Sequence, residues 1–367
     1  MSELIPITVA AIILSILSHR ASEYDPIRCR YGRQDRHWFF LLAIVMILFV
    51  GLRTQYNDTD NYELLYEKMD LSTKLSWTLG ENPLFHLVNR VLRQFGFSAQ
   101  SFLLFHSAVI LWLNLWFFRK YSCNLPFTIF LFFTVGAFIF TMAAIKQCVS
   151  MAICLIAIDR FLHKKHLSFV LWILVAAGFH PYALMYLVVP LLTFRPWSLM
   201  TVIMLAIFAV ASMIMEQLIG TIVDVTDLLG ENFDAESFTG EGVNPFRVAV
   251  VSVPILISFL TQTEIARKKD RAQNLMVNLA MLNAEIMFVG LFGTANYFAR
   301  LAYYFLPFQA LAMPWLLSHF ETRSRRFITF GAIGGYSAYY VFSNAILDNF
   351  DYHYASVTLW SYLKSLF

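Results

Sequence analysis

Long apolar stretches, separated by short clusters of charged residues, dominate the chain. About 20 apolar residues suffice for a helix to cross the hydrocarbon core of a bilayer. Runs of this length, or slightly shorter, lie near residues 4–18, 38–52, 101–118, 125–141, 143–161, 198–216, 246–262, 275–293, 300–318 and 327–346. The pattern predicts an all-α, polytopic integral membrane protein. The first run has no small-residue cleavage site after it, so we expect a retained helix rather than a signal peptide.

The apolar segment 167–194 is interrupted by the sequence Gly178-Phe179-His180-Pro181. Proline lacks a backbone N–H and disfavours helix at the preceding residue, so we expect two short helices or a re-entrant pair that meet at this break. The chain then has about 12 transmembrane or half-membrane helices. One face receives 18 of the 27 lysines and arginines. This bias identifies that face as cytoplasmic and puts both termini outside.

Composition agrees with a lipid-embedded chain. Hydrophobic residues make up 59% of the sequence, charged residues 14%, and the mean hydropathy is +0.61, whereas soluble domains are about 45–50% apolar and about 25% charged. A net charge of +3 is too small to favour nucleic-acid binding. The four cysteines lack metal-type spacing, and so do the histidines and acids. We therefore expect no nucleic-acid partner, no metal and no cofactor.

Two of the predicted outer loops are long. Residues 53–100 contain two sets of apolar residues at helical spacing, the second opened by Asn82-Pro83 and closed by Gly96, so we expect amphipathic helices at the membrane interface. Residues 217–245 hold six acids and no lysine or arginine, and form either a solvated acidic loop or a mobile lid. No repeat or linker divides the chain, so we expect residues 1–367 to form a single polytopic membrane domain.

Four basic residues lie at the ends of apolar runs on the predicted outer face, against the topological bias: Arg53, Lys146, Arg247 and Arg300. Each alone is explained by a side chain that snorkels at a helix end. Together with His180 at the broken helix, they could line one cationic cavity that holds an anion near lipid. Arginine forks and helix N-termini bind phosphate oxygens, so the expected ligand is a lipid-linked phosphate or pyrophosphate.

Several polar residues are candidates for other roles. His180 is the first choice for a general base, because an imidazole titrates near neutrality and Pro181 holds it at the break. The outer acids Asp58 and Asp60 could position sugar hydroxyls or serve as the base. Glu285, predicted in mid-span, is either a hydrogen-bond partner inside the bundle or a group coupled to the site.

Short motifs follow one another along the chain in a particular order. They are Gly51-Leu52-Arg53 followed by Asp58-Thr59 and Tyr62, then Asn82-Pro83-Leu84-Phe85 with Asn89, Lys146-Gln147, Gly178-Phe179-His180, and Arg300 with Tyr304. Over about residues 38–318 this pattern resembles the EpsG family of exopolysaccharide biosynthesis proteins, which are Wzy-like polymerases. Two positions depart from the family pattern: Lys146 replaces the usual Arg, and Tyr56-Asn57 stands where a Gly usually precedes the acid.

The resemblance implies a relative of GT-C-type integral-membrane glycosyltransferases. Such a protein polymerises repeat units, as of exopolysaccharide or O-antigen, at the outer face of the bacterial inner (cytoplasmic) membrane. Donor and acceptor are then oligosaccharides linked to undecaprenyl pyrophosphate, with a flippase and a chain-length regulator as expected partners. Tyr62, Gln147 and Tyr304 would position the substrate. Two other functions stay open: a transporter or flippase of a polyprenyl-linked or anionic glycan, and an integral-membrane sugar acyltransferase.

Overall fold

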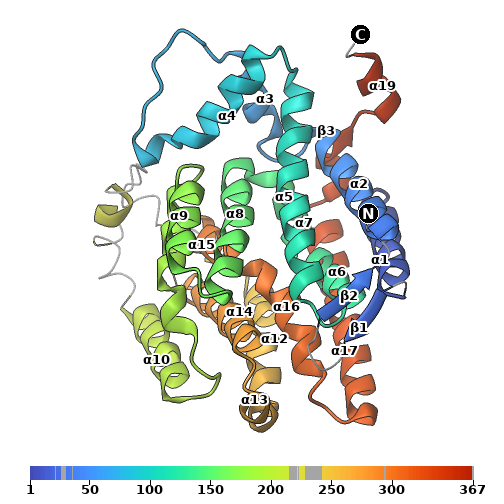
Figure 1. Cartoon of the computed structure of the whole chain (residues 1–367), viewed down its shortest axis with the longest axis vertical. Coiled ribbons are helices and arrows are strands. Elements are labelled where there is room, and N and C mark those ends of the chain that lie inside the picture. The colour runs from blue at the N-terminus through green and yellow to red at the C-terminus, as the bar shows by residue number, and fades with distance from the viewer. Residues whose placement is uncertain are drawn as a thin grey trace. The chain divides into compact units, whose positions relative to one another are not determined.

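The computed structural model describes residues 1–20, 22–25, 30–34, 36–214, 221, 223–227, 242–292 and 295–365. The chain divides into two compact units: unit 1 comprises Met1–Leu184 and Ala338–Phe367, and unit 2 comprises Met185–Ser337. Both are built of helices (Figure 1). The predicted all-α class is therefore confirmed, although two small two-stranded sheets accompany the helices. The expectation of a single membrane domain stays a prediction.

Unit 1 holds the first helices and the C-terminal elements. In chain order it contains α1 (Leu4–Arg20), β1 (Ser22–Asp25), β2 (Arg30–Gln34), α2 (Arg36–Gly51), β3 (Arg53–Gln55), α3 (Thr59–Glu67), the 3₁₀ helix η1 (Leu79–Glu81), α4 (Pro83–Gln94), α5 (Ala99–Tyr121), α6 (Leu125–Thr134), α7 (Ala137–Ala143), α8 (Ile145–Leu162), α9 (His166–Ala177), the start of η2 (Pro181–Leu192), the π-helix η4 (Phe342–Leu347), α18 (Phe350–His353), β4 (Ala355–Ser356) and α19 (Leu359–Lys364).

Unit 2 is formed by the middle of the chain. It contains the rest of η2, then α10 (Leu199–Met213), α12 (Pro245–Leu260), α13 (Gln262–Lys268), α14 (Arg271–Val289), α15 (Ala295–Tyr303), α16 (Leu306–Leu317) and most of α17 (Thr322–Val341). Most of the acidic segment 217–245 lies outside the described residues. The two alternatives for that segment, a solvated acidic loop and a mobile lid, both stay predictions.

In unit 1, helix packing holds together the region where α2 ends and α5 begins. α2 lies between α1 and α5, and α8 packs against α5 and α9 (Figure 1). A Cβ on Gly51 would lie 2.9 Å from the Cα of Leu104, so only glycine allows α2 to approach α5 this closely. Immediately after this contact β3 pairs with β4, with Arg53 opposite Ser356. The C-terminal residues thereby hold the segment that follows α2.

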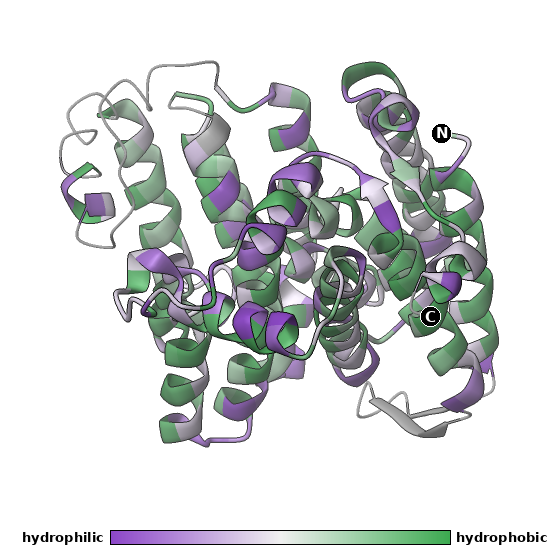
Figure 2. Ribbon diagram, turned by 90° about the horizontal axis from the view of Figure 1, so that it is seen from above, coloured by the Kyte–Doolittle hydropathy of each residue, from purple (hydrophilic) through white to green (hydrophobic). Residues whose placement is uncertain are grey.

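Unit 2 is organised around α14, which contacts α10, α12, α15 and α16. Buried amides connect this helix to its neighbours. Asn278 Nδ2 donates to the carbonyls of Leu192 and Phe194, both at 2.8 Å. Gln309 Nε2 on α16 donates to Asn283 Oδ1 at 2.8 Å. In both units the helices are largely apolar, while polar residues gather in the connections (Figure 2). The hydrogen bonds that these amide groups donate inside an apolar bundle favour one specific packing.

Among the described residues, α5 is long and apolar enough to cross a membrane by itself. Two bent pairs pass the same test together: α6 with α7, bent by 53°, and α12 with α13, bent by 70°. Six further apolar helices are shorter. These lengths fit a helical membrane protein. They do not confirm about 12 membrane helices, which stay a prediction.

The structure tests two of the predicted helix boundaries. The break in segment 167–194 is confirmed, because α9 ends at Ala177 and η2 begins at Pro181. The prediction of one helix over residues 300–318 is wrong, because α15 ends at Tyr303 and α16 begins at Leu306. Pro307 occupies the first turn of α16, where its missing N–H costs no helical hydrogen bond.

Candidate functional site

The residues expected at the site are distributed over both units. Unit 1 holds Arg53, Asp58, Asp60, Tyr62, Lys146, Gln147 and His180, and unit 2 holds Arg247, Arg300 and Tyr304. The single cationic cavity expected from the sequence draws on both units and stays a prediction. Within each unit, however, the structure brings several of these residues into connected networks.

Arg53 is buried, with 1% of its surface exposed, directly after α2. Its Nε donates to Thr59 Oγ1 at 3.0 Å, and its Nη1 donates to the Val50 carbonyl at 2.6 Å and to Ser107 Oγ at 3.4 Å. Burial lowers the pKa of the Arg53 guanidinium to about 10, against an opposing effect of Tyr354. The group remains protonated at neutral pH. Its hydrogen bonds connect the end of α2, the start of α3 and the middle of α5.

The turn before α3 explains one departure from the EpsG pattern. Asn57 has φ of 48°, in the left-handed region that favours glycine and that asparagine tolerates better than most other residues. Asn57 can therefore adopt the left-handed backbone conformation for which glycine is otherwise suited. Asp58 follows at the N-cap position of α3 and is half-buried, and Asp60 is exposed in the first turn. The two acids thus lie close to the buried Arg53–Thr59 contact.

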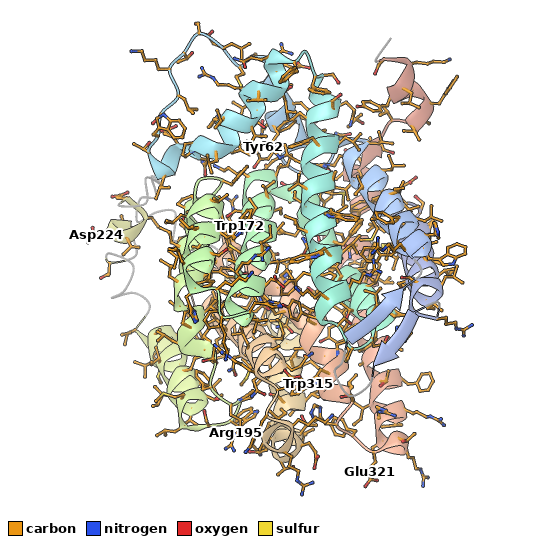
Figure 3. The ribbon with its side chains drawn as sticks, in the orientation of Figure 1. Tyr62, Trp172, Arg195, Asp224, Trp315 and Glu321 are labelled. Atoms are coloured by element: carbon orange, nitrogen blue, oxygen red, sulfur yellow. The ribbon has the colours of Figure 1, made fainter. Side chains whose placement is uncertain are left out.

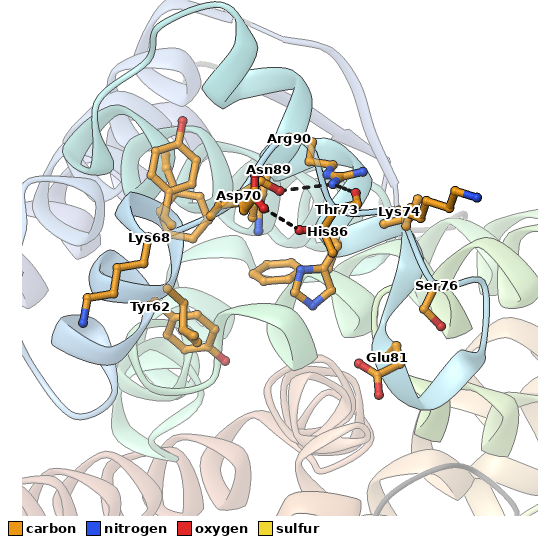
Figure 4. Close-up of a pocket in the computed structure, with 16 residues that line it drawn as sticks. Tyr62, Lys68, Asp70, Thr73, Lys74, Ser76, Glu81, His86, Asn89 and Arg90 are labelled. Carbon is orange, nitrogen blue, oxygen red and sulfur yellow. Dashed lines mark hydrogen bonds between the residues drawn. The ribbon is translucent and has the colours of Figure 1, made fainter.

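Tyr62 lines an open cavity of about 390 Å³ bounded by α3, α4, the loop between them and the start of α5. Figure 3 shows Tyr62 at the end of unit 1 that carries α3 and α4. Tyr66, Phe85 and Phe102 give the cavity an aromatic wall. Its polar lining consists of Lys68, Asp70, Thr73, Lys74, Ser76, Glu81, His86, Asn89 and Arg90 (Figure 4). The sequence motifs do not indicate His86 as a site residue. Its spacing to Asn89 and Arg90 nevertheless places the three residues on one face of a helix.

The broken helix that holds His180 packs against α4. The Leu84 N–H donates to the Gly178 carbonyl at 2.9 Å, and a Cβ on Gly178 would lie 2.6 Å from Leu84 Cγ. His180 is 5% exposed; its carbonyl accepts a hydrogen bond from Ser150 Oγ at 3.3 Å, and its ring lies 4.9 Å from the ring of Tyr182. The break at His180 therefore supports the helix that forms one side of the cavity.

Lys146 lies in the first turn of α8, as predicted, beside the buried Gln147. Partial desolvation lowers the pKa of the His86 imidazole on α4, and the positive charges of Lys146 and Arg90 lower it further, against the opposing effect of Glu81. Lysine keeps the charge of the arginine usual in the family but lacks its bidentate fork.

Both expected site arginines of unit 2 are connected with α15, Arg300 as a residue of this helix and Arg247 through a contact with it. Arg247, in the first turn of α12, donates from Nη1 to the Tyr303 hydroxyl at 2.6 Å. Arg300 is exposed and lies one turn before Tyr303 on α15, so it neighbours the position that Arg247 contacts. The expectation that Arg300 begins a helix is wrong: it lies in the last turn of α15, where the helix dipole favours a cation. Tyr304 is buried, and its carbonyl accepts a hydrogen bond from the Tyr186 hydroxyl at 2.6 Å.

Glu285 on α14 is 4% exposed, and neither of its carboxylate oxygens has a hydrogen-bond partner among the described residues. The described residues therefore do not support Glu285 as a hydrogen-bond partner inside the bundle, and coupling to the site stays a hypothesis. Cys148 and Cys154 are buried free thiols. In the described part of the chain, no group of three histidines, cysteines or acids could hold a metal ion.

The chain matches a known protein family. No curated protein and no solved structure matches the chain. The model of the EpsG family matches residues 36–356, a range that includes every expected site residue from Arg53 to Tyr304. The chain therefore belongs to the EpsG family.

Proposed function

We propose that this protein is a polysaccharide polymerase that joins undecaprenyl-pyrophosphate-linked repeat units by glycosyl transfer at the outer face of the bacterial cytoplasmic membrane. Membership of the EpsG family over residues 36–356 carries the proposal. The apolar helices support a membrane location. The cavity of unit 1, with aromatic and polar residues in its lining, supports a glycan as ligand.

The proposed reaction needs no metal. A hydroxyl oxygen of the acceptor sugar attacks the anomeric carbon of the donor and forms the new glycosidic bond. The bond between that carbon and the pyrophosphate oxygen breaks, and its electron pair leaves with undecaprenyl pyrophosphate. His180 takes the hydroxyl proton, and Asp58 or Asp60 is the alternative base.

Cationic side chains are proposed to stabilise the negative charge that grows on the departing pyrophosphate. Arg247 and Arg300 share this role in unit 2, where Tyr303 holds the Arg247 guanidinium beside the helix turn of Arg300. Lys146 and Arg53 contribute positive charge in unit 1. A well-placed donor of this kind contributes about 3–4 kcal/mol to transition-state stabilisation. Tyr62, Gln147 and Tyr304 are proposed to position the substrate.

Deletion of the gene tests the proposed function. We expect single lipid-linked repeat units to accumulate, while polymer is lost. The lipid-linked glycans would be extracted, released by mild acid and sized by mass spectrometry. Loss of surface glycan with no outer-leaflet intermediate would indicate a flippase instead, and polymer of normal length that lacks an acyl group would indicate an acyltransferase.

Substitution of His180 tests the base. His180→Ala is expected to slow transfer by about 10²–10⁴-fold, the usual contribution of general-base catalysis. Binding of undecaprenyl pyrophosphate should change little, because the pyrophosphate is held by the cationic residues. Normal polymerisation by a folded His180→Ala protein would exclude His180 and make Asp58 or Asp60 the next candidate.

A further inference from the structure

The open cavity between α3 and α4 has the size of a ligand-binding site. Its volume, about 390 Å³, lies within the range of about 300–1,000 Å³ that is typical of small-ligand sites. Three sets of side chains line it: an aromatic wall, a group of polar residues on α4 and the loop before it, and the aliphatic residues Leu65, Met69 and Leu75. The position and chemistry of these side chains indicate which kind of molecule the cavity can bind.

The aromatic wall is held in place from behind. Tyr66 and Phe102 stack with ring centres 4.8 Å apart, and both are almost fully buried. The Tyr66 hydroxyl donates to the Phe97 carbonyl at 2.9 Å. Phe85 continues the wall, with the Tyr62 ring edge-on to it at 6.1 Å. A fixed aromatic surface of this kind suits the apolar C–H face of a ring rather than a flexible chain.

Two of the charged lining residues are used to build the loop between α3 and α4. Asp70 accepts hydrogen bonds from the Ser72 N–H at 2.8 Å and from the Thr73 hydroxyl at 3.0 Å. Arg90 Nη2 donates to the carbonyls of Asp70, at 3.2 Å, and of Thr73. These contacts fix the rim of the cavity. Asp70 and Arg90 therefore shape the site rather than form its binding surface.

The other polar lining residues face the cavity as a mixture of donors and acceptors. Figure 4 shows the His86 imidazole in the middle of the lining, with Tyr62 and Glu81 on either side. His86 and Glu81 are exposed, and Asn89 is buried with its Oδ1 2.8 Å from His106 Nε2. An imidazole nitrogen can accept a hydrogen bond and a carboxylate accepts several, whereas an anion site is built from hydrogen-bond donors and positive charges.

We propose that this cavity binds a sugar ring of the glycan, with the apolar face of the sugar on the Tyr62 ring and with His86 and Glu81 accepting hydrogen bonds from its hydroxyls. The inference rests on the proposed function, because it assigns the cavity to the glycan part of the lipid-linked substrate. A polyhydroxylated ring fits since it offers apolar C–H faces and hydroxyls together. A free phosphate would meet the carboxylate of Glu81, and a hydrocarbon chain would leave His86 and Glu81 without partners.

Binding of a glycan without its lipid tests the assignment. The full chain would be placed in lipid nanodiscs, with oligosaccharides of one and two repeat units as the probe. These are obtained by partial acid hydrolysis of the exopolysaccharide of the producing strain. Saturation-transfer NMR and calorimetry would report contact and affinity. We expect the wild type to bind, and His86→Ala and Glu81→Gln each to weaken binding about fivefold, as loss of one hydrogen bond predicts.

A matched control is His353→Ala, which removes an exposed histidine of unit 1 outside the cavity. It should bind like the wild type. Absence of binding to the wild type, or equal affinity of wild type and both cavity variants, would overturn the inference. Inorganic pyrophosphate could also compete with the oligosaccharide for the cavity. If Lys68→Ala or Lys74→Ala abolished this competition, the cavity would be an anion site and the inference would be overturned. Glu81→Gln keeps the shape of the side chain and guards against loss of folding.

The test separates this inference from the proposed function. If the oligosaccharide binds through His86 and Glu81 but lipid-linked repeat units are never joined, the cavity is a glycan site in a protein that is not a polymerase. If repeat units are joined but the cavity variants bind the oligosaccharide like the wild type, the polymerase stands and the cavity assignment fails.

Discussion

The buried Arg53 network gives a prediction whose size follows from the contacts. Arg53→Lys keeps the positive charge but removes the planar group that reaches Thr59, Val50 and Ser107 at the same time. A lysine ammonium at the end of an unbranched chain can reach one of these acceptors without moving the backbone. We therefore expect Arg53→Lys to destabilise the protein even if its charge is not needed for activity.

The magnitude can be estimated from the bonds that are lost. A hydrogen bond from a charged group contributes about 1.5–3 kcal/mol, and breaking a buried charged network costs about 3–5 kcal/mol. With 1% of Arg53 exposed, little solvent screening reduces these values. We expect Arg53→Lys to lower the free energy of unfolding by about 3 kcal/mol. Thr59→Val removes the acceptor of the Arg53 Nε–H and also the hydrogen bond that the Thr59 hydroxyl donates to the Tyr56 carbonyl, so it should cost about 2–3 kcal/mol.

Equilibrium unfolding in mixed detergent micelles, followed by circular dichroism, would measure both values. Thr59→Ser is the matched control, because it keeps the hydroxyl that accepts from Arg53 Nε, and it should remain close to the wild type. An Arg53→Lys protein as stable as the wild type would refute the reasoning. A Thr59→Val protein as stable as the wild type would do the same.

Three further substitutions test other parts of the structure. Gly178→Ala should lower the thermal unfolding midpoint, because the new methyl would meet Leu84 at 2.6 Å and overpacking costs about 1–3 kcal/mol; an unchanged midpoint would show that Leu84 moves aside freely. Arg300→Lys should reduce polymerisation well below wild type, because charge without the guanidinium fork binds pyrophosphate less well, and full activity would make Arg300 an interface anchor only. In a cysteine-free background, a membrane-impermeant thiol reagent added from outside should label Ser76→Cys but not Lys269→Cys, both of which replace exposed side chains; labelling of both or neither would refute the topology.

Local sequence signals predicted the elements that depend on local chemistry. Pro181 indicated the break before η2, and Asn82-Pro83 with Gly96 marked the limits of α4. Proline and left-handed backbone positions act within a few residues, so their effect can be read from the sequence. The same signal was available at Pro307, which marks the start of α16 and would have separated Arg300 from that helix.

Features that depend on distant residues could not be predicted in this way. The pairing of Arg53 with Ser356 joins segments from opposite ends of the chain, and the burial of Arg53 depends on Ser107 of α5. Apolar periodicity carries no information on such pairs. His86 was missed for a related reason: its place in the cavity depends on the fold of the loop that Arg90 holds, as well as on its own helix.

Polymerisation by the purified protein tests the central claim most directly. The protein would be reconstituted in liposomes with radiolabelled undecaprenyl-pyrophosphate-linked repeat units as the only substrate. We predict a ladder of products that differ by one repeat unit, with one undecaprenyl pyrophosphate released for each bond formed. Repeat units that remain single in the presence of folded wild-type protein, or that cross the bilayer without being joined, would contradict the account.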